Sequence, residues 1–447
     1  MTDATAQSFI DTFERERASL PGADGWLAAR REAAVRELAD AGLPHRRLED
    51  WKYTDLRDVL EKAAFTPAPV HQGAVFLSEE DTRNGAALFH AIDRYKIVFV
   101  NGRLNRALSD MEDLPEGVVL KPFADVLGEA WTKALIERRF EINWQAQSVS
   151  ALNMALMADG VALHVEEGVT LDKPVHLIFL AADDGASHMR TLVRLEKQAQ
   201  ATVFETHASA GAAHYFVDLV TEVSLGVGAT LNHIKLQDEA EDAVHLATMR
   251  AALADEAKLD SFTMIAGGGV SRGQTFVEFE GRAAEAHVNG AYALRGKQHA
   301  DQFCVVDHAV PECNSHTHFK GVLDDESQGI FQGKVVVRPD AQQTDGRQMT
   351  NALLLSRDAS INAKPELEIY ADDVQCAHGS TIGELDKDAL FYLRSRGIDE
   401  MTARQLLISA FLDEALDYAP HEEARAELKA LVAGWFEAGN LSAEDIL

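Results

Sequence analysis

The stretch CVVDHAVPECNSHTHFKGV, from Cys304 to Val322, holds two of the three cysteines in the chain and three of its histidines. Thiolate and imidazole groups are the side chains that zinc and iron prefer in proteins. Their spacing, C-x3-H-x4-C-x2-H-x-H, matches neither a zinc finger nor a zinc hydrolase, and Pro311 interrupts any strand between the two pairs. We therefore expect packed or surface side chains and no constitutive metal, with a transient iron contact by His316 or His318 left open. The candidate ligands are Cys304, His308, Cys313, His316 and His318.

A second thiol and imidazole lie close together in DDVQCAHGSTIGELD, residues 372–386. Cys376 and His378 are two residues apart, so on a strand both side chains point to the same side. Gly379 gives the backbone freedom to turn just beyond them. A thiolate beside an imidazole could accept sulfur or hold iron. The structural alternative is a buried thiol and a hydrogen-bonded histidine.

The segment GGVSRGQT, from Gly268 to Thr275, has the outline of a phosphate-binding loop. Gln274 stands where that loop carries its lysine, and no helix pattern follows. We expect a glycine-rich turn here, and a chain that does not hydrolyse nucleotides by itself.

The chain has 447 residues, an apolar content of 46% and a net charge of −30. This length allows a large core, and this charge repels nucleic acid and anionic membranes. No apolar run approaches the roughly 18 residues of a membrane span, and the N-terminus lacks the pattern of an export signal. Three cysteines suit free thiols in a reducing compartment. These features predict a cytoplasmic protein that binds neither nucleic acid nor membrane.

Both ends of the chain show the 3.6-residue period of helices. Near the N-terminus, Asp24 is the expected N-cap and Gly42 the stop of a helix whose apolar stripe is Leu27, Ala34, Leu38 and Ala41. Near the C-terminus, we expect a helix that places Leu407, Phe411, Ala415 and Tyr418 on one face. A last helix is expected to carry the stripe Leu428, Leu431, Val432, Trp435 and Phe436.

Between these helical regions the period is 2, as in β-strands. In YFVDLVTEVSL, from Tyr215, apolar residues alternate with Asp218, Glu222 and Ser224, which predicts a polar outer side. Runs such as KIVFVNG, VHLIFLA and KVVVRPD read as further strands.

Four-residue words with a small or branched second residue and a Leu or Val fourth return along the middle of the chain. The words return at intervals of 28 to 32 residues, with almost no helical pattern between them. This interval favours a β-solenoid. In the alternative fold, a sandwich of hairpins, turns would recur every 8–12 residues. Helices at both ends would cover the open coils of the solenoid. The words are GVTL from Gly168, QATV from Gln200, GATL from Gly228, EAKL from Glu256 and EAHV from Glu285, with DASI from Asp358 as a later copy.

From Val306 to about Ala415 the chain closely resembles the SufD family of iron–sulfur cluster assembly scaffolds. The matching words are HTHFKGVLDDESQGIFQGKVVV, AQQTDGRQMTNALLLS, KPELEIYADDVQCAHGSTIGELD, LFYLRSRGI and ARQLLISAF. A weaker match is HRRLEDWKYTDL, residues 45–56. The resemblance implies a mainly β fold: a right-handed parallel β-helix core flanked by N-terminal and C-terminal α-helical regions. We assign residues 1–90 to the N-terminal helical region, 91–383 to the β-helix and 384–447 to the C-terminal helices.

The resemblance also implies a function and partners. SufD-like proteins are non-catalytic scaffold subunits that join a SufB-like paralogue and a SufC-like ABC ATPase, with sulfur supplied indirectly by a cysteine desulfurase. No cofactor is tightly bound, and a nascent Fe–S cluster or iron is held transiently at the SufB-like interface. The family's C-S-H-G word reads Cys376-Ala377-His378-Gly379 here, so His378 is the expected cluster-assembly residue and Cys376 a weaker one. The segment 386–415 would dock the ATPase through Leu390, Phe391, Leu393, Arg394, Leu406, Leu407 and Phe411.

Two other functions are open to a chain of this kind. A β-helix can be a polysaccharide-active enzyme, although such enzymes are usually exported and need charged residues clustered on a groove. A metal-binding module could be built on the stretch from Cys304 to His318. A homodimer through the β-helix is a further option for the isolated chain, because a two-fold interface needs only self-complementarity.

Overall fold

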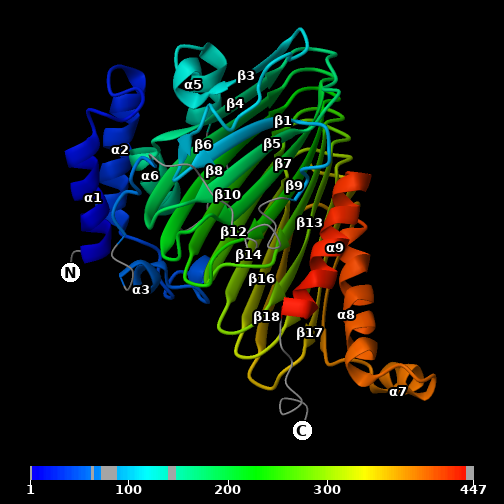
Figure 1. Ribbon diagram of the computed structural model, residues 1–447. Coiled ribbons are helices and arrows are strands. Elements are labelled where there is room, and N and C mark those ends of the chain that lie inside the picture. Colours follow the sequence, from blue (N-terminus) through cyan, green and yellow to red (C-terminus); the bar gives the residue numbers. More distant parts are fainter. Residues whose placement is uncertain (1–2, 62–64, 72–87, 139–146, 439–447) are drawn as a thin grey trace.

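The computed structural model describes residues 3–61, 65–71, 88–138 and 147–438. Its centre is a β-solenoid in which strands β4 to β19 alternate between two parallel sheets, as Figure 1 shows. The ten-stranded sheet contains β1 (Tyr95–Val100), β2 (Arg103–Leu104), β5 (Val175–Ala181), β7 (Gln200–Ser209), β9 (Thr230–Asp238), β11 (Lys258–Ile265), β13 (Glu285–Leu294), β15 (Asn314–Leu323), β17 (Thr344–Leu354) and β19 (Val374–Gly383). The nine-stranded sheet contains β3 (Val118–Pro122), β4 (Asp159–Val165), β6 (Gly185–Leu195), β8 (Tyr215–Leu225), β10 (Val244–Leu253), β12 (Val270–Phe279), β14 (His299–His308), β16 (Gln328–Val337) and β18 (Ser360–Ile369).

Parallel strands β4 to β19 and helices at both ends confirm the predicted β-solenoid flanked by helical regions. Each turn adds one strand to each sheet, and the inward side chains of both sheets fill the space between them with a continuous apolar core. We call this space the lumen. The strand-like runs from Lys96, Val175 and Lys334 lie in β1, β5 and β16, as expected.

The repeating words mark one corner of the solenoid. The corner residue has a positive φ at Gly168, Gln198, Gly228, Glu256, Ala283 and Glu312. The next residue is small and fully buried at Ala199, Ala229, Ala257, Ala284 and Cys313. Each carbonyl in this stack accepts a hydrogen bond from the turn that follows, for example Lys258 N to Ala229 O at 2.8 Å.

Three of the words are misaligned with this corner. Gln200 and Glu285, the first letters of their words, pair with Thr230 and Lys258, which are third letters. A slip of two residues leaves every side chain on the same side of the strand, so the alternation could not reveal it. DASI begins two residues before β18 and ends on that strand, which is in the other sheet.

N-terminal helices cover the outer side of the nine-stranded sheet (Figure 1). They are α1 (Ala4–Glu16), α2 (Trp26–Ala41), α3 (Leu56–Glu61), α5 (Ala130–Glu137) and α6 (Gln147–Leu156), with the 3-10 turns η1 (Glu49–Trp51) and η2 (Phe123–Val126). The last two of these helices lie within the stretch 91–383 that we assigned to the β-helix.

The predicted cap and stripe of α2 are only partly right. Gly25, and not Asp24, is the N-cap, while Gly42 ends the helix at φ +69 as expected. Leu27, Ala34 and Leu38 are buried, but Ala41 is exposed. Arg31 joins the buried face, where its guanidinium donates to the carbonyls of Met154, Ala155 and Met157 at 3.2, 2.7 and 2.8 Å.

The polar side of β8 does not face water. Asp218 and Glu222 are 0% and 1% exposed, because the N-terminal helices lie over this side of the sheet. Each carboxylate is paired: Asp218 with His188 at 2.7 Å, and Glu222 with Arg190 at 3.2 Å. The alternation identified the outer side correctly but could not show that helices cover it.

C-terminal helices α7 (Lys387–Ser395), α8 (Glu400–Leu416) and α9 (Glu422–Ala438) follow β19. The last two pack on the outer side of the ten-stranded sheet, and the buried face of α8 contains Ile408, Leu412 and Leu416. The predicted stripe lies partly beside this face, since Tyr418 is 43% exposed. Leu428 and Val432 of α9 are buried as expected. The side chain of Phe436 lies outside the described residues.

Within the described ranges, no helix combines the length and the apolar character that crossing a lipid bilayer requires.

Candidate functional site at the open end of the solenoid

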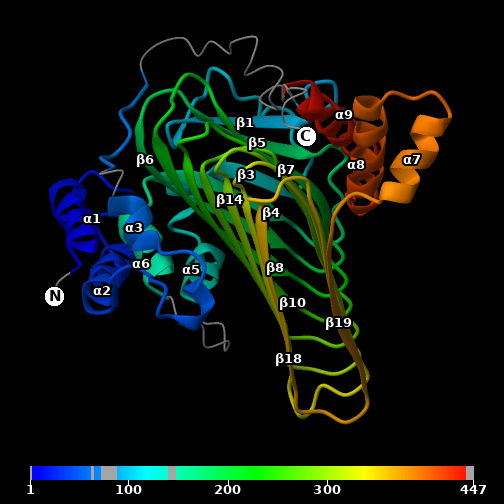
Figure 2. The ribbon, with the colours of Figure 1, turned by 90° about the horizontal axis from the view of Figure 1, so that it is seen from below.

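The solenoid ends in two edge strands. Among the described strands, β19 is last in the ten-stranded sheet and β18 is last in the nine-stranded sheet. Figure 2 views the solenoid from this end, and none of the labelled helices lies over these two strands. An edge strand presents backbone N–H and C=O groups that can pair with another chain. We call β17, β18 and β19 the open end.

Cys376 and His378 lie side by side on the last strand. Their partners in β17 are Gly346 and Gln348, so both residues continue the inward row of the ten-stranded sheet. Cys376 packs against the lumen core and is half-buried, while His378 is exposed. The shared direction predicted from their spacing is confirmed. No described residue makes a hydrogen bond with the imidazole of His378.

The β17 residue beside Cys376 is Gly346, which has no side chain. A Cβ atom built on Gly346 would lie 3.5 Å from Sγ of Cys376, so the glycine leaves the thiol without a side-chain neighbour at that position. Burial raises the pKa of the Cys376 thiol, and the backbone N–H of Gly346 opposes this by a hydrogen bond. The thiol therefore stays protonated until a base or a metal is brought to it.

Large apolar side chains surround the open end. Met349 is 39% exposed, Ile369 40%, Tyr370 62% and Ile382 48%. Exposed apolar residues beside unpaired strand edges are typical of an interface with another protein.

The motif HRRLEDWKYTDL clamps the nine-stranded sheet. Trp51 is fully buried, and the guanidinium of Arg272 lies 3.9 Å from the centre of its ring. Arg272 is ion-paired with Asp301, which also accepts a hydrogen bond from Thr54 Oγ1 at 2.6 Å. The clamp continues to the edge strand, where Lys364 contacts Glu49 at 2.6 Å. This motif thus connects the N-terminal helices to strands β12, β14 and β18.

The five candidate ligands of the stretch from Cys304 to His318 do not lie around one common site. Cys304 and His308 point into the lumen from β14, as their shared parity predicts. Burial raises the pKa of Cys304 to about 12 and lowers that of His308 to about 3. Cys313 occupies the stack of small corner residues and is 0% exposed. These three residues therefore have structural places in the lumen and its corner.

His316 and His318 lie on the opposite side of the ten-stranded sheet from Cys376 and His378. Their rings pack against Tyr418, with centroid distances of 5.3 and 5.4 Å. Nε2 of His318 is 2.8 Å from the amide oxygen of Asn351. Burial lowers the pKa of His316 to about 4 and also lowers that of His318. The sheet separates these two histidines from the open end.

The glycine-rich segment from Gly268 forms a turn and then strand β12, as expected in place of a phosphate loop. Gly268 has φ +89, and Cβ atoms on Gly267 and Gly269 would lie 2.4 Å from Glu239 N and 2.2 Å from Glu241 O. The glycines allow this turn to approach the loop after β9 closely.

The predicted ATPase-docking residues fall on the two helices that follow β19. No residue of α7 is buried, and in Figure 1 this helix projects away from the solenoid. Phe391 and Leu406 are 74% and 49% exposed. Arg394 is exposed and pairs with Glu400 at 2.8 Å. The remaining predicted residues, Leu390, Leu393, Leu407 and Phe411, are half-buried.

The lumen also contains a buried polar network that the sequence patterns did not predict. Glu205, His233 and Lys235 point inward from β7 and β9, within the middle turns of the solenoid. A signal was present: the parity that makes Leu231 an inward residue also applies to His233 and Lys235.

Comparison with known proteins identifies similar chains. Residues 3–177 match the family model "SufBD protein N-terminal region", and residues 178–411 match "SUF system FeS cluster assembly, SufBD core domain". An iron–sulfur cluster assembly SufBD family protein of Synechocystis is 31% identical over 440 residues, which cover 94% of this chain and 93% of the relative. The iron–sulfur cluster assembly protein SufD of Escherichia coli is 29% identical over 405 residues, which cover 89% of this chain and 90% of the relative.

Proposed function

The chain belongs to the SufBD family of iron–sulfur cluster assembly proteins, and from this premise we propose that it is a non-catalytic scaffold subunit which lends His378 to a cluster-assembly site shared with a partner. The partner is a SufB-like paralogue in the cytoplasm, and it pairs with the open end of the solenoid. The nascent cluster is the cargo of this site and not a resident cofactor.

One observation carries the proposal: an exposed imidazole and a half-buried thiol lie side by side on an edge strand. Strand edges recruit other strands, so a paralogous solenoid can continue both sheets of this one by backbone hydrogen bonds. Such pairing would bring partner side chains to the row that contains Cys376 and His378. The surrounding apolar residues would be buried in the same interface.

A shared site also suits the chemistry of assembly and release. Four cysteine thiolates are the usual ligands of a finished cluster. A site that combines one imidazole from this chain with groups from a partner would hold the cluster less tightly. Because the ligands lie on two subunits, a motion of one subunit relative to the other would open the site.

The exposed helix α7 and the adjoining part of α8 are the proposed docking surface for a SufC-like ABC ATPase. Phe391 and Leu406 present apolar area that no described residue covers, as partner-binding helices require. Removal of the whole C-terminal region would be a poor test, because Ile408, Leu412 and Leu416 belong to the core that covers the ten-stranded sheet.

Co-expression with SufB-like and SufC-like subunits, followed by purification of the complex, tests both parts of the proposal. His378→Ala should retain both partners but lower the iron and acid-labile sulfide content at least about ten-fold, since a ligand is lost. The combined Phe391→Ala and Leu406→Ala variant should lose the ATPase and keep the SufB-like subunit, because truncation of buried apolar anchors costs about 2 kcal/mol or more each.

Matched variants control for indirect effects. His318→Ala removes an imidazole from the other side of the same sheet and should leave cluster content unchanged. Val227→Ala trims another exposed apolar residue, on a solenoid turn away from these helices, and should leave ATPase binding unchanged. Normal cluster content in the His378→Ala complex, or a purified chain that pairs only with a second copy of itself, would refute the shared site.

A further inference from the structure

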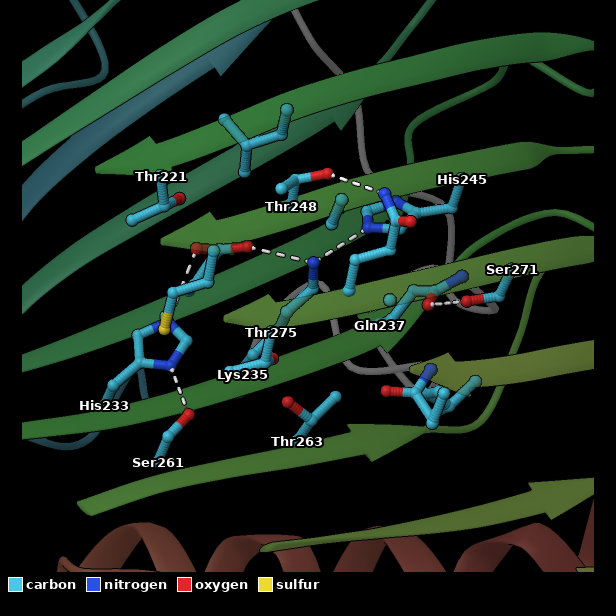
Figure 3. Close-up of a pocket in the computed structure, with 18 residues that line it drawn as sticks. Thr221, His233, Lys235, Gln237, His245, Thr248, Ser261, Thr263, Ser271 and Thr275 are labelled. Atoms are coloured by element: carbon cyan, nitrogen blue, oxygen red, sulfur yellow. Dashed lines mark hydrogen bonds and ion pairs between the residues drawn. The ribbon is translucent and has the colours of Figure 1, made fainter. Parts of the chain in front are cut away.

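The polar network in the middle of the lumen links residues from four strands and one loop. Lys235 Nζ lies 3.2 Å from a carboxylate oxygen of Glu205 and 2.8 Å from Nε2 of His245. Figure 3 shows Lys235 between these two groups, with dashed lines to both. His207 Nε2 contacts Glu205 at 2.7 Å, so both ends of the network reach buried histidines.

Three buried polar atoms at one end of this network lack a hydrogen-bond partner in the part of the chain that the structure describes. His207 Nδ1, His245 Nδ1 and Glu239 Oε2 are buried and make no hydrogen bond within the described residues. His245 Nδ1 and Glu239 Oε2 are 2.8 Å apart, but their geometry is not that of a hydrogen bond. Unpaired polar atoms are costly to bury, and three of them at one place call for a ligand.

The negative charge of Glu239, at the same end of the network, is also unbalanced. Glu239 forms an ion pair with no lysine or arginine among the described residues, and its carboxylate lies 2.8 Å from Nδ1 of His245. The nearest cation is Lys235, which already contacts Glu205. A buried carboxylate of this kind is stable only with a positive partner.

We propose that His207, Glu239 and His245 form a buried binding site for one divalent transition-metal ion, of the class of Zn²⁺ or Fe²⁺. Their candidate ligand atoms all lie within 4.8 Å of one another, and all three side chains are buried. Two imidazole nitrogens and one carboxylate oxygen are a common ligand set for these ions. The site is separate from the open end, and its existence does not depend on the proposed function.

The backbone holds the three ligands from two neighbouring turns of the solenoid. His207 is on β7, His245 is on β10, and Glu239 lies in the loop directly after β9. The turn at Gly267–Gly269 packs against this loop, and Gly268 N donates to Glu239 O at 2.9 Å. The glycines that resembled a phosphate loop therefore fix the position of the carboxylate ligand.

A metal ion at this place would bind Nδ1 of His245, the ring nitrogen that lies 2.8 Å from Glu239 Oε2. The other ring nitrogen, Nε2, lies 2.8 Å from Lys235 Nζ. A cavity of about 40 Å³ adjoins Lys235 and His245 and gives the ammonium group room to move when the ion binds.

The test uses the full chain without an affinity tag, produced in medium supplemented with Co²⁺, which has visible absorption bands that report its ligands. The expected result is one cobalt ion per chain by elemental analysis, with bands typical of nitrogen and oxygen ligands. His207→Asn and His245→Asn should each lower the retained cobalt at least about ten-fold. His308→Asn is the matched control, because His308 is another buried lumen histidine with an unpaired Nδ1 and should leave cobalt retention unchanged.

A second variant separates a metal site from a purely structural network. The pair Glu205→Gln and Lys235→Met removes the competing ammonium together with its carboxylate partner, so no buried charge of that pair is left alone. Because the cation is gone, cobalt affinity should rise about ten-fold or more. Cobalt below about a tenth of an equivalent in both the parent chain and this double variant, or retention that the two histidine substitutions do not change, would overturn the proposal.

Discussion

The middle turns and the last turn of the solenoid direct similar side chains into the same lumen, but in opposite surroundings. In the middle turns, Glu205, Lys235 and the neighbouring histidines are enclosed by further turns and hold one another by direct contacts. At the last turn, Cys376 and His378 lie on an edge strand with one side open. Burial and pairing fix the first group in one arrangement. Cys376 and His378 keep ligand atoms that a partner can reach.

This difference indicates how one fold can serve two purposes. A group enclosed on every side can exchange its ligands only when the solenoid opens, so it suits a permanent structural role. A group on the last turn can be covered and uncovered by the docking of another chain. The position of a residue along the solenoid axis therefore matters more for function than its type.

The largest expected contrast between the two regions concerns buried charge. Lys235→Met should lower the free energy of unfolding by about 3–5 kcal/mol, because the buried carboxylate of Glu205 loses its cation. Urea unfolding followed by circular dichroism measures this loss. The double variant with Glu205→Gln should recover much of it. At the open end, Lys364→Met breaks a contact to the exposed Glu49 and should have a much smaller effect. Equal losses from the two lysine substitutions would contradict the comparison.

Thiol reactivity should sharpen the same contrast. Cys376 is half-buried at the open end, while Cys304 and Cys313 are buried and burial raises their pKa to about 12 and about 11. A chromogenic disulfide at pH 8 should therefore modify one thiol at least about 100-fold faster than the other two, which react only after local opening. Cys376→Ser should abolish the fast phase, and all three thiols should react quickly in denaturant. Two fast thiols in the native chain would show that the lumen is not closed.

A smaller effect is expected from pH. His308 is buried near one corner of the lumen, and burial lowers its pKa from 6.5 to about 3 in the folded chain. Above pH 6.5 the imidazole is neutral in both the folded and the unfolded chain, so its titration does not change the free energy of unfolding. As the pH falls from about 6.5 towards 3, the unfolded chain takes up a proton that the folded chain refuses, so stability falls.

His308→Gln removes this proton uptake and should flatten the decline by up to about 1.4 kcal/mol per pH unit. Chemical unfolding at intervals between pH 8 and pH 4 measures the two slopes. The comparison of slopes is valid even if the substitution lowers stability at every pH. An unchanged slope would mean that His308 is accessible to protons in the folded state.

Much of the architecture could be predicted from local patterns. The period of 2 located strand β8, apolar runs that end in turn residues located β1, β5 and β16, and the return of the corner words predicted the solenoid. The spacing of Cys376 and His378 was sufficient to place both on one side of a strand. The alignment of the words failed at Gln200 and Glu285, because a two-residue slip preserves parity.

The fate of the polar residues could not be predicted in the same way. Asp218 and Glu222 were placed on the polar side of their strand, and this side is buried beneath helices that lie far away in the sequence. Cys304, Cys313 and His316 follow one another closely in the chain, yet they occupy the lumen, a corner and the outer side of a sheet. His207 comes close to Glu239 and His245 only because successive turns stack.

The sequence by itself determined the solenoid, its flanking helices, its family and the parity of each strand, because these depend on periods and on short words that are complete within the chain. Only the tertiary structure decided which sides are covered, which charges are buried and which histidines meet. Coverage and stacking bring together residues from different turns, and no local pattern records those distances.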